Sequence, residues 1–318
     1  MTTTPETSGP GPGRGPGGGP DADLPGLLDE RRQLVNLAYR LLGSFADAED
    51  VVQETYARWY AMRAPDREAI ESPGAWLMKV ASRICLDELR SARHRRERYV
   101  GEWIPEPLPD RAEWADPRGP AQPADPADRV TLDESVNMAF LVLLDSMTPA
   151  ERVAFILHDV FGYPFGEVAD IVGRTPAACR QLASSARARL RAAQAPAASM
   201  AGQAAIVREF KRAWEARDIP ALLGILDPSA IAIADGGGRV SAELRPIEGR
   251  EQVARTVLDL AQHVPGLALV ERTVNGAPGL VLEQDGAVVT VMAFEVAGHR
   301  IRHIWAVRNP DKLRPWTR

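Results

Sequence analysis

The sequence predicts a multidomain protein in which two all-α domains precede a C-terminal α+β domain. Apolar residues recur at helical spacing in residues 24–98 and again in residues 129–192. A proline-rich stretch, 101–128, separates these two helical regions, and strand-like alternation of apolar and polar residues begins only after residue 203. Helices followed by a run of strands are typical of an α+β domain.

The composition limits the class of protein. The 318 residues include 45% hydrophobic and 25% charged residues, with a net charge of −5, which is ordinary for a globular protein. We expect no membrane span, because no apolar run is long enough. Residues 1–23 are rich in Gly and Pro without an apolar segment, which predicts a disordered tail rather than a secretory signal. Cys85 and Cys179 lie far apart, which indicates packing thiols in a reduced, cytoplasmic protein.

The first helical domain is predicted over residues 24–100. Its first helix has apolar residues at helical spacing from Leu34 to Leu42, and Gly43 follows as a break. The segment DAEDVVQETYARWY (47–60) begins a second helix with acidic residues in the first turn, where the helix dipole favours them. A third helix, 73–98, begins with a proline after a serine cap and becomes increasingly basic.

Two linkers are predicted from composition. Residues 101–128 hold seven prolines and are mostly acidic. Proline at this density prevents both a helix and a central strand, so we expect an extended and partly mobile linker. The segment AQAPAASMAG (193–202) is a second, shorter linker.

The second helical domain is predicted over residues 129–192. We expect one helix over 131–147 and another that begins with Thr148 as its N-cap and Glu151 in a capping box. The segments FGEVADIV and PAACRQLASSARARLRAA follow, joined by a short Gly-Arg-Thr turn. Two short helices joined in this way form a helix-turn-helix.

The last helix of this pair is purely cationic. From Arg174 to Arg191 the chain has five arginines and no acidic residue. A helix-turn-helix places its second helix in the major groove of DNA, where Arg and Gln side chains bind base edges, and we expect Arg174 and Arg189 to contact phosphates. The alternative is a solvated basic face on an ordinary helix bundle. The acidic helix 47–60 would repel DNA, so we expect it to bind a basic protein partner.

The third domain is predicted over residues 203–318. The helix IVREFKRAWEAR is followed by four strand-like segments: AIAIAD, GLALVERTV, GLVLEQDGAVVTVMAFEV and HRIRHIWAVRNP. The dipeptide Asp285-Gly286 predicts a tight hairpin turn between apolar runs.

The helical segments resemble a known family. DAEDVVQETYARWY is similar to region 2.2 of the extracytoplasmic-function (ECF) RNA polymerase sigma factors of the sigma-70 family. SPGAWLMKVASRICLDELRSARHRR resembles their region 2.3–2.4, and the segment from TPAERVAF to SSARARL resembles region 4, with Met147 where leucine is usual. The C-terminal part resembles one subgroup with a fused SnoaL-like domain, through the motifs WIPEPL (103–108), DGGG (235–238) and NPDKL (309–313).

The resemblance implies a sigma factor that directs transcription initiation by reading −10 and −35 promoter elements and is regulated in cis by its SnoaL-like domain. Its implied partners are core RNA polymerase, through the β′ clamp and the β flap, and promoter DNA, with no cofactor and no metal. The residues expected to read the −35 element are Arg174, Thr175, Arg180, Gln181, Ser184 and Arg187. Those expected to read the −10 element are Lys79, Arg83, Arg90 and Arg93. Those expected to bind polymerase are Asp47, Glu49, Asp50, Gln53 and Glu54.

The resemblance also implies regulatory contacts: the glycine-rich loop is expected to touch the sigma domains or the 101–128 linker, and the charged pair Asp311 and Lys312 of the tail is expected to clasp region 2. In the linker the expected residues are Trp103, Pro105, Glu106 and Pro107. In the C-terminal domain they are Asp235, Gly236, Gly237, Gly238, Asn309, Pro310, Asp311, Lys312 and Leu313. The bland alternatives are that the glycine-rich loop is only a turn and that the tail only caps a strand.

The C-terminal domain also has a catalytic alternative. SnoaL-like folds are cone-shaped α+β barrels, and some relatives are enzymes that use a carboxylate or a histidine. The candidates here are Asp235, His263, Asp285, His299 and His303. A spacing of four puts His299 and His303 on one face of a strand, unless His299 lies in the preceding turn. No metal-ligand spacing is convincing, so we expect a ligand-sensing or structural pocket and not an enzyme.

Two other classes of protein compete with the sigma factor. One is a ligand-responsive helix-turn-helix transcription regulator, and the other is a SnoaL-type enzyme with an accessory DNA-binding part. A simple repressor needs neither the acidic helix 47–60 nor a second basic helix, so both features favour the sigma factor.

Overall fold

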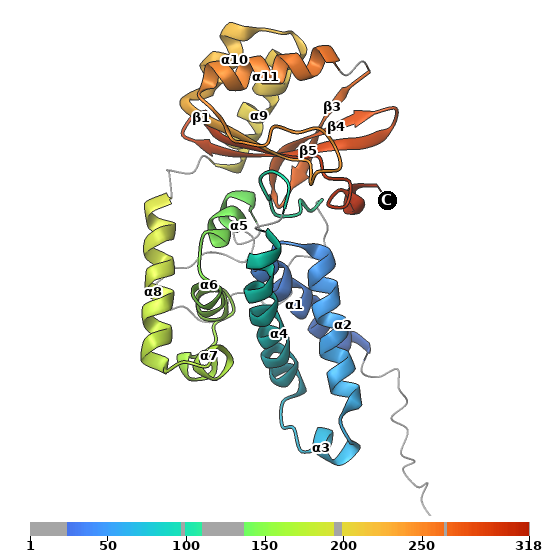
Figure 1. Ribbon diagram of the computed structural model, residues 1–318, viewed down its shortest axis with the longest axis vertical. Helices are drawn as coiled ribbons and strands as arrows, with labels where there is room; N and C mark the ends of the chain where they lie inside the picture. Colours follow the sequence, from blue (N-terminus) through green and yellow to red (C-terminus); the bar gives the residue numbers. More distant parts are fainter. Residues whose placement is uncertain (1–23, 97–98, 110–136, 194–198, 264–265, 318) are drawn as a thin grey trace, which may run out of the picture.

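The structure of the chain, a computed structural model, describes residues 24–96, 99–109, 137–193, 199–263 and 266–317. A six-stranded sheet lies between two sets of helices (Figure 1). The helices of residues 24–193 lie on one side of the sheet, and those of the C-terminal part pack against the other. The predicted order, two all-α domains followed by an α+β domain, is confirmed. The predicted tail 1–23 lies outside the described residues.

The first helical domain contains α1 (Leu24–Leu42), α2 (Phe45–Ala61), α3 (Ala64–Glu68) and α4 (Pro73–Arg96). The predicted break between α1 and α2 is confirmed. Gly43 ends α1 in the left-handed conformation with φ +71°, which glycine adopts without strain. Ser44 caps α2, since its Oγ accepts a hydrogen bond from the amide of Asp47 at 3.2 Å. The short helix α3 was not predicted.

The second helical domain contains α5 (Met138–Asp145), α6 (Pro149–Phe155), the π-helix η4 (Ile156–Val160), α7 (Phe165–Val172) and α8 (Pro176–Ala193). The capping box of Thr148 and Glu151 is present as predicted. The helix expected over 131–147 differs, because α5 begins at Met138, after the N-cap Asn137, and residues before Asn137 lie outside the described ones. The predicted helix-turn-helix is α7 and α8, joined through Gly173 with φ +71°.

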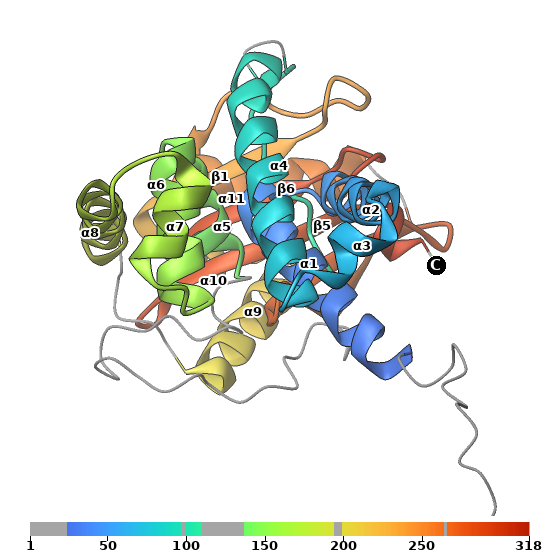
Figure 2. The same ribbon diagram turned by 90° about the horizontal axis from the view of Figure 1, so that it is seen from below.

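The two helical domains share one hydrophobic core. Its fully buried side chains include Leu37 and Leu41 of α1, Cys85 of α4 and Phe155 of α6. The helix α4 lies between α1 and α2 on one side and α6 and α7 on the other (Figure 2). Arg152 links the domains further: its guanidinium donates to the backbone oxygen of Leu41 at 2.8 Å in a buried contact. The domains are therefore packed against each other.

The C-terminal domain contains α9 (Met200–Glu215), α10 (Ile219–Ile225) and α11 (Arg250–His263), and the strands β1 (Leu226–Asp235), β2 (Ile247–Glu248), β3 (Ala268–Val274), β4 (Ala277–Gln284), β5 (Ala287–Ala297) and β6 (Arg300–Val307). The strand order is β2-β1-β6-β5-β4-β3, with β1 parallel to β6 and the other pairs antiparallel. Asp285 (φ 53°) and Gly286 (φ 78°) form the predicted hairpin turn between β4 and β5. The sequence did not indicate α10, α11 or β2.

The two faces of the sheet pack against different parts of the chain. One face meets α9 to α11 in a core that includes Phe210, Trp214 and Phe294. The other face packs against the linker residue Ile104 and against Met138 of α5. Residues 104–108 are all buried and form no helix or strand, so this part of the linker is packed against the rest of the protein. The remaining linker residues from 110 onward lie outside the described ones.

Candidate promoter, polymerase and interdomain surfaces

Most of the predicted −35 residues are exposed on α8 and on the turn that precedes it. Arg174, Thr175, Arg180, Gln181 and Ser184 are all exposed. The Oγ1 of Thr175 accepts a hydrogen bond from the amide of Ala178 at 3.2 Å and so caps the start of α8. In Figure 1, α8 lies at the outer edge of the molecule.

Two arginines of α8 point toward the rest of their own domain. The Nε of Arg187 donates to the backbone oxygen of Ala183 and lies 3.6 Å from the Oδ1 of Asp159. Arg189 donates to the backbone oxygen of Ser146 at 3.2 Å. The structure thus places Arg187 apart from the other predicted −35 residues, since its side chain is partly buried and paired. Arg189, which was expected to contact a DNA phosphate, also bonds within its own domain.

Two of the candidate −10 residues of α4 contact the second helical domain through their side chains. The Nζ of Lys79 lies 3.3 Å from the Oδ2 of Asp170 on α7. Arg83 donates to the backbone oxygen of the same residue at 3.0 Å. Arg90 is exposed and pairs with Asp87 on its own helix at 3.2 Å. The side chain of Arg93 lies outside the described ones.

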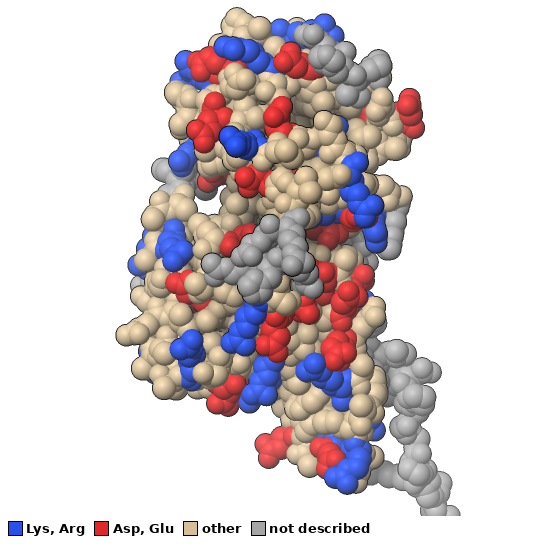
Figure 3. Space-filling model, viewed as in Figure 1, with Lys and Arg blue, Asp and Glu red and all other residues tan. Residues whose placement is uncertain are grey.

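The helix α2 carries an exposed acidic face. Asp47, Asp50, Gln53 and Glu54 are exposed, whereas Glu49 is half-buried and lies 3.6 Å from Arg31. Figure 3 shows acidic side chains gathered over this helix. The apolar residues Val51 and Val52 bury the opposite side of the helix, as its amphipathic pattern requires.

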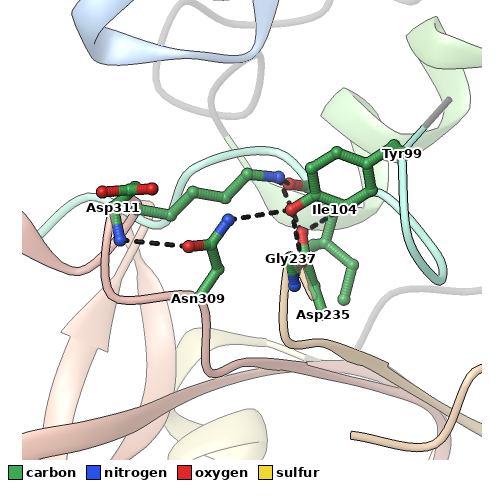
Figure 4. A network of polar contacts seen from close by, with 7 residues as sticks. Tyr99, Ile104, Asp235, Gly237, Asn309 and Asp311 are labelled. Atoms are coloured by element: carbon green, nitrogen blue, oxygen red, sulfur yellow. Dashed lines mark hydrogen bonds and ion pairs between the residues drawn. The ribbon is translucent and has the colours of Figure 1, made fainter. Parts of the chain in front are cut away.

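The carboxylate of Asp235 joins three separate segments of the chain (Figure 4). Its Oδ1 accepts from the hydroxyl of Tyr99 at 2.6 Å and from the amide of Gly237 at 3.0 Å. Its Oδ2 accepts from the amide of Ile104 at 3.0 Å and pairs with Lys312 at 2.7 Å. Asp235 is completely buried, and its bonds satisfy both oxygens. We call Asp235, Tyr99, Ile104 and Lys312 the Asp235 hub.

The ammonium group of Lys312 is enclosed by the linker. It also donates to the backbone oxygen of Ile104 and lies 4.2 Å from the centre of the Trp103 ring and 5.2 Å from that of Tyr99. Burial, and then the hydrogen bond to Asp235, raise the pKa of the Tyr99 hydroxyl. Tyr99 therefore stays protonated and donates to the carboxylate.

The DGGG loop and the NPDKL tail meet at this hub. A side chain at Gly237 (φ +58°) would collide with the amide of Asn309, which donates to the hydroxyl of Tyr99 at 2.9 Å. Gly236 and Gly238 also lie close to neighbouring residues. Asp311 stays within the C-terminal domain, 3.1 Å from Arg239, while Leu313 is buried and Pro310 is exposed. The loop and the tail thus contact the linker at Ile104, and a regulatory role for these contacts stays a prediction.

The linker is held at a second point that the sequence did not indicate. Asn275, in the turn between β3 and β4, exchanges two hydrogen bonds with Leu108, at 2.9 and 3.1 Å. Its Nδ2 donates to the hydroxyl of Tyr39 on α1 at 2.6 Å, and that hydroxyl donates to the backbone oxygen of Glu106 at 2.7 Å. The dipeptide Asn275-Gly276 could have been identified as a turn, but nothing in the sequence names its partners.

The four predicted linker residues are all in contact with other segments. Trp103 and Pro105 lie against Gly43, where an added Cβ would come 2.8 Å from the Trp103 ring. Glu106 bonds to the start of α2: its Oε2 accepts from the amide of Phe45 at 2.7 Å. Pro107 accepts a hydrogen bond from the Trp316 indole at 2.8 Å.

The candidate catalytic residues are not brought together. Asp235 is in the hub, Asp285 is exposed in a hairpin turn, and the side chain of His263 lies outside the described ones. His299 lies in the turn before β6, so it does not share a strand face with His303. His303 bonds to Glu295 and stacks on Trp305 with ring centres 5.5 Å apart. No group of three or more His, Cys, Asp and Glu suited to a metal occurs in the part of the chain that the structure describes.

No helix among residues described by the structure is long and apolar enough to cross a membrane. The two cysteines, Cys85 and Cys179, are both buried as free thiols.

Comparison with known proteins identifies both helical domains. Residues 27–95 match the family Sigma-70 region 2, and residues 137–190 match Sigma-70, region 4. The chain is 37% identical over 302 residues to the ECF RNA polymerase sigma factor SigJ of Mycobacterium tuberculosis, covering 89% of this chain and 90% of that one. It is 36% identical over 286 residues to the probable ECF RNA polymerase sigma factor SigI of the same species, covering 90% and 92%.

A solved structure is similar along nearly the whole chain, the C-terminal domain included. The crystal structure of the Mycobacterium tuberculosis extracytoplasmic function sigma factor SigJ superposes with a TM-score of 0.70 at 31% identity, covering 91% of this chain and 98% of that one. The chain therefore belongs to the ECF sigma factors of the sigma-70 family, which direct RNA polymerase to specific promoters, and it carries a C-terminal α+β domain in addition to its two sigma domains.

Proposed function

We propose that this sigma factor is regulated in cis by its C-terminal domain, which acts through the Asp235 hub. The observation that carries this proposal is the number of segments that one buried carboxylate joins. Asp235 bonds to Tyr99, just beyond the −10 helix α4, to Ile104 in the linker, and to Lys312 in the tail. A change in the C-terminal domain would therefore reach the linker between the sigma domains directly.

The proposed DNA contacts follow from exposure and charge. The exposed face of α8 is the −35 reader, with Arg180 and Gln181 as the side chains suited to base edges. The exposed side of α4 is the −10 reader, with Lys79, Arg83 and Arg90. Because Asp170 of α7 contacts Lys79 and Arg83, binding of the −10 element competes with this contact.

The proposed polymerase contact is the acidic face of α2. Its exposed carboxylates would complement a basic surface on the β′ clamp of core polymerase, and the second sigma domain would bind the β flap. Both assignments to polymerase subunits come from the family resemblance.

The C-terminal domain is proposed to work through contacts and not through catalysis. Asp235 is committed to four hydrogen-bonding partners, and His303 to Glu295. Side chains that include Phe210, Trp214 and Phe294 form a hydrophobic core between the sheet and its own helices. A small-molecule ligand in this domain stays a prediction.

The assignment of α8 is tested with two arginine variants and a matched control. In promoter-binding assays of holoenzyme, Arg180→Ala should change the preference at one base pair of the −35 element and cost about 1–3 kcal/mol. Arg174→Ala should weaken binding on all promoter variants alike, with the salt slope reduced by about one. Arg208→Ala removes the same charge from the C-terminal domain, where Arg208 pairs with Glu271, and should change neither quantity. If Arg180→Ala and Arg174→Ala behaved alike on all promoters, the assignment of α8 would be wrong.

A further inference from the structure

Glu106 of the linker fills the corner between α1 and α2. Its amide donates to the backbone oxygen of Gly43 at 2.7 Å, and its backbone oxygen accepts from the hydroxyl of Tyr39 at 2.7 Å. Its carboxylate accepts from the amide of Phe45 at 2.7 Å and also from the amide of Ala46. The residue is only 4% exposed, and its bond with Tyr39 is buried, while its bond with Phe45 is partly buried.

These contacts complete the N-terminus of α2. The first amides of a helix have no partner within the helix and need acceptors from elsewhere. Ser44 supplies one acceptor, for the amide of Asp47, and Glu106 supplies the acceptor for Phe45 and Ala46. The first turn of the proposed polymerase-binding helix is therefore capped by two side chains, one local and one from the linker. A carboxylate at this end is also favoured by the helix dipole.

The C-terminal domain fixes Glu106 from both sides. On one side, Lys312 and Asp235 hold Ile104. On the other side, Asn275 holds Leu108 through two hydrogen bonds and also donates to the same Tyr39 hydroxyl that bonds to Glu106. The cap on α2 thus depends on a turn that lies more than 200 residues away in the chain.

The contact leaves the acidic face of α2 open. Asp47, Asp50, Gln53 and Glu54 are exposed while Glu106 is in place. The linker therefore stabilises the start of the helix without covering the side chains that polymerase would bind.

We propose that Glu106 is a positioning residue for polymerase binding: held by the Asn275 turn, it caps α2 and orients the acidic face toward core polymerase. The C-terminal domain then supports the binding of polymerase instead of competing with it. This inference rests on the proposed role of α2 in polymerase binding.

The test measures the affinity of full-length variants for core polymerase without DNA, with thermal unfolding recorded alongside. Glu106→Ala removes the acceptor and should weaken binding by about three- to tenfold, the range of a lost helix cap. Glu106→Gln keeps an acceptor oxygen and should stay within about twofold of the unmodified protein. Ser44→Ala removes the local cap and should weaken binding to a similar degree.

The dependence on the C-terminal domain is tested with Asn275→Gly, which keeps the turn conformation (φ 51°) and deletes the side-chain bonds to Leu108 and Tyr39. In this background Glu106→Ala should lose most of its effect, because the linker is already loosened. Ser44→Ala should keep its full effect there. If Glu106 had only a general structural role, Asn275→Gly would change the effect of Glu106→Ala on affinity as much as it changes the effect of Ser44→Ala.

A charge reversal separates the inference from the function on which it rests. Asp50→Lys lies in the proposed binding face, and Asp50 has no role in the cap. If Asp50→Lys weakens binding while Glu106→Ala leaves it unchanged or strengthens it, the positioning role is wrong and the binding face stands. If neither variant weakens binding, the binding face itself is wrong. An equal loss in Glu106→Ala and Glu106→Gln would exclude capping as the cause.

Discussion

Two ion pairs connect distant segments of this sigma factor, and they differ in their surroundings. The pair of Asp235 and Lys312 is buried, with side chains 0% and 10% exposed. The pair of Lys79 and Asp170 is open to solvent, with side chains 40% and 66% exposed. The first lies within the C-terminal domain, where both of its members also bond to Ile104 of the linker. The second joins the two sigma domains.

Because the two pairs differ in burial, we expect them to differ in how easily they exchange partners. Breaking a buried pair leaves a charge without a partner in a medium that solvates it poorly, so such a pair persists. An exposed pair contributes little and exchanges readily with other ions. Under the proposed −10 role of α4, a DNA phosphate would replace Asp170 on Lys79, whereas no ion from the solvent can easily replace Lys312 in the Asp235 hub.

The largest effect is expected at the buried pair. Lys312→Ala should lower the free energy of unfolding by about 3–5 kcal/mol, because the carboxylate of Asp235 loses its counter-charge in a buried site. Chemical denaturation of the full chain measures this. Arg314→Ala is the matched control, since Arg314 forms an exposed pair with Asp311 in the same tail and should cost less than about 1 kcal/mol. Equal losses in the two variants would remove the distinction between the hub and an ordinary surface pair.

A smaller effect is expected at the exposed pair. Asp170→Asn should raise the affinity of the free protein for −10 promoter DNA by up to about fivefold at low salt, because Lys79 is released. The contact of Arg83 involves the backbone of residue 170 and should persist. The gain should shrink as the salt concentration rises.

The control for this variant is Glu167→Gln on the same helix, which removes an equal charge from an exposed position. An equal gain in both variants would mean that general repulsion, and not the contact with Lys79, limits DNA binding. Gel-shift or anisotropy titrations at several salt concentrations distinguish the two explanations.

The features that the sequence predicted correctly are local ones. The capping box of Thr148 and Glu151, the break at Gly43, and the turn at Asp285-Gly286 each depend on residues a few positions apart. The acidic face of α2 was also predicted, because amphipathic spacing fixes which side of a helix is exposed. The three motifs are far apart in the sequence, and the structure brings one residue of each, Ile104, Asp235 and Lys312, into contact. That these contacts are regulatory stays a prediction.

The features that the sequence did not predict depend on contacts between distant residues. Tyr39 and Asn275 are 236 positions apart, and neither lies in a pattern that names the other. The contact of Asp170 with Lys79 could not be predicted either. Nothing in the sequence distinguishes Asp170 from other acidic residues, because the contact exists only when α7 packs beside α4. Arg187 shows the limit of helical spacing as well: the predicted outward position is partly buried, because Asp159 of the neighbouring π-helix lies within ion-pair distance.

The most direct test of the account is transcription by core polymerase in vitro with Asp235→Asn. We propose that α4 and α8 determine which promoters are chosen. We propose that the Asp235 hub, which holds the linker beside α2, determines how much productive holoenzyme forms. Start sites should be mapped and transcripts quantified on genomic DNA from the source organism, with the unmodified protein and the variant compared. The account predicts the same start sites with both proteins and fewer transcripts with the variant. Unchanged transcript levels, or a shift to other start sites, would contradict it.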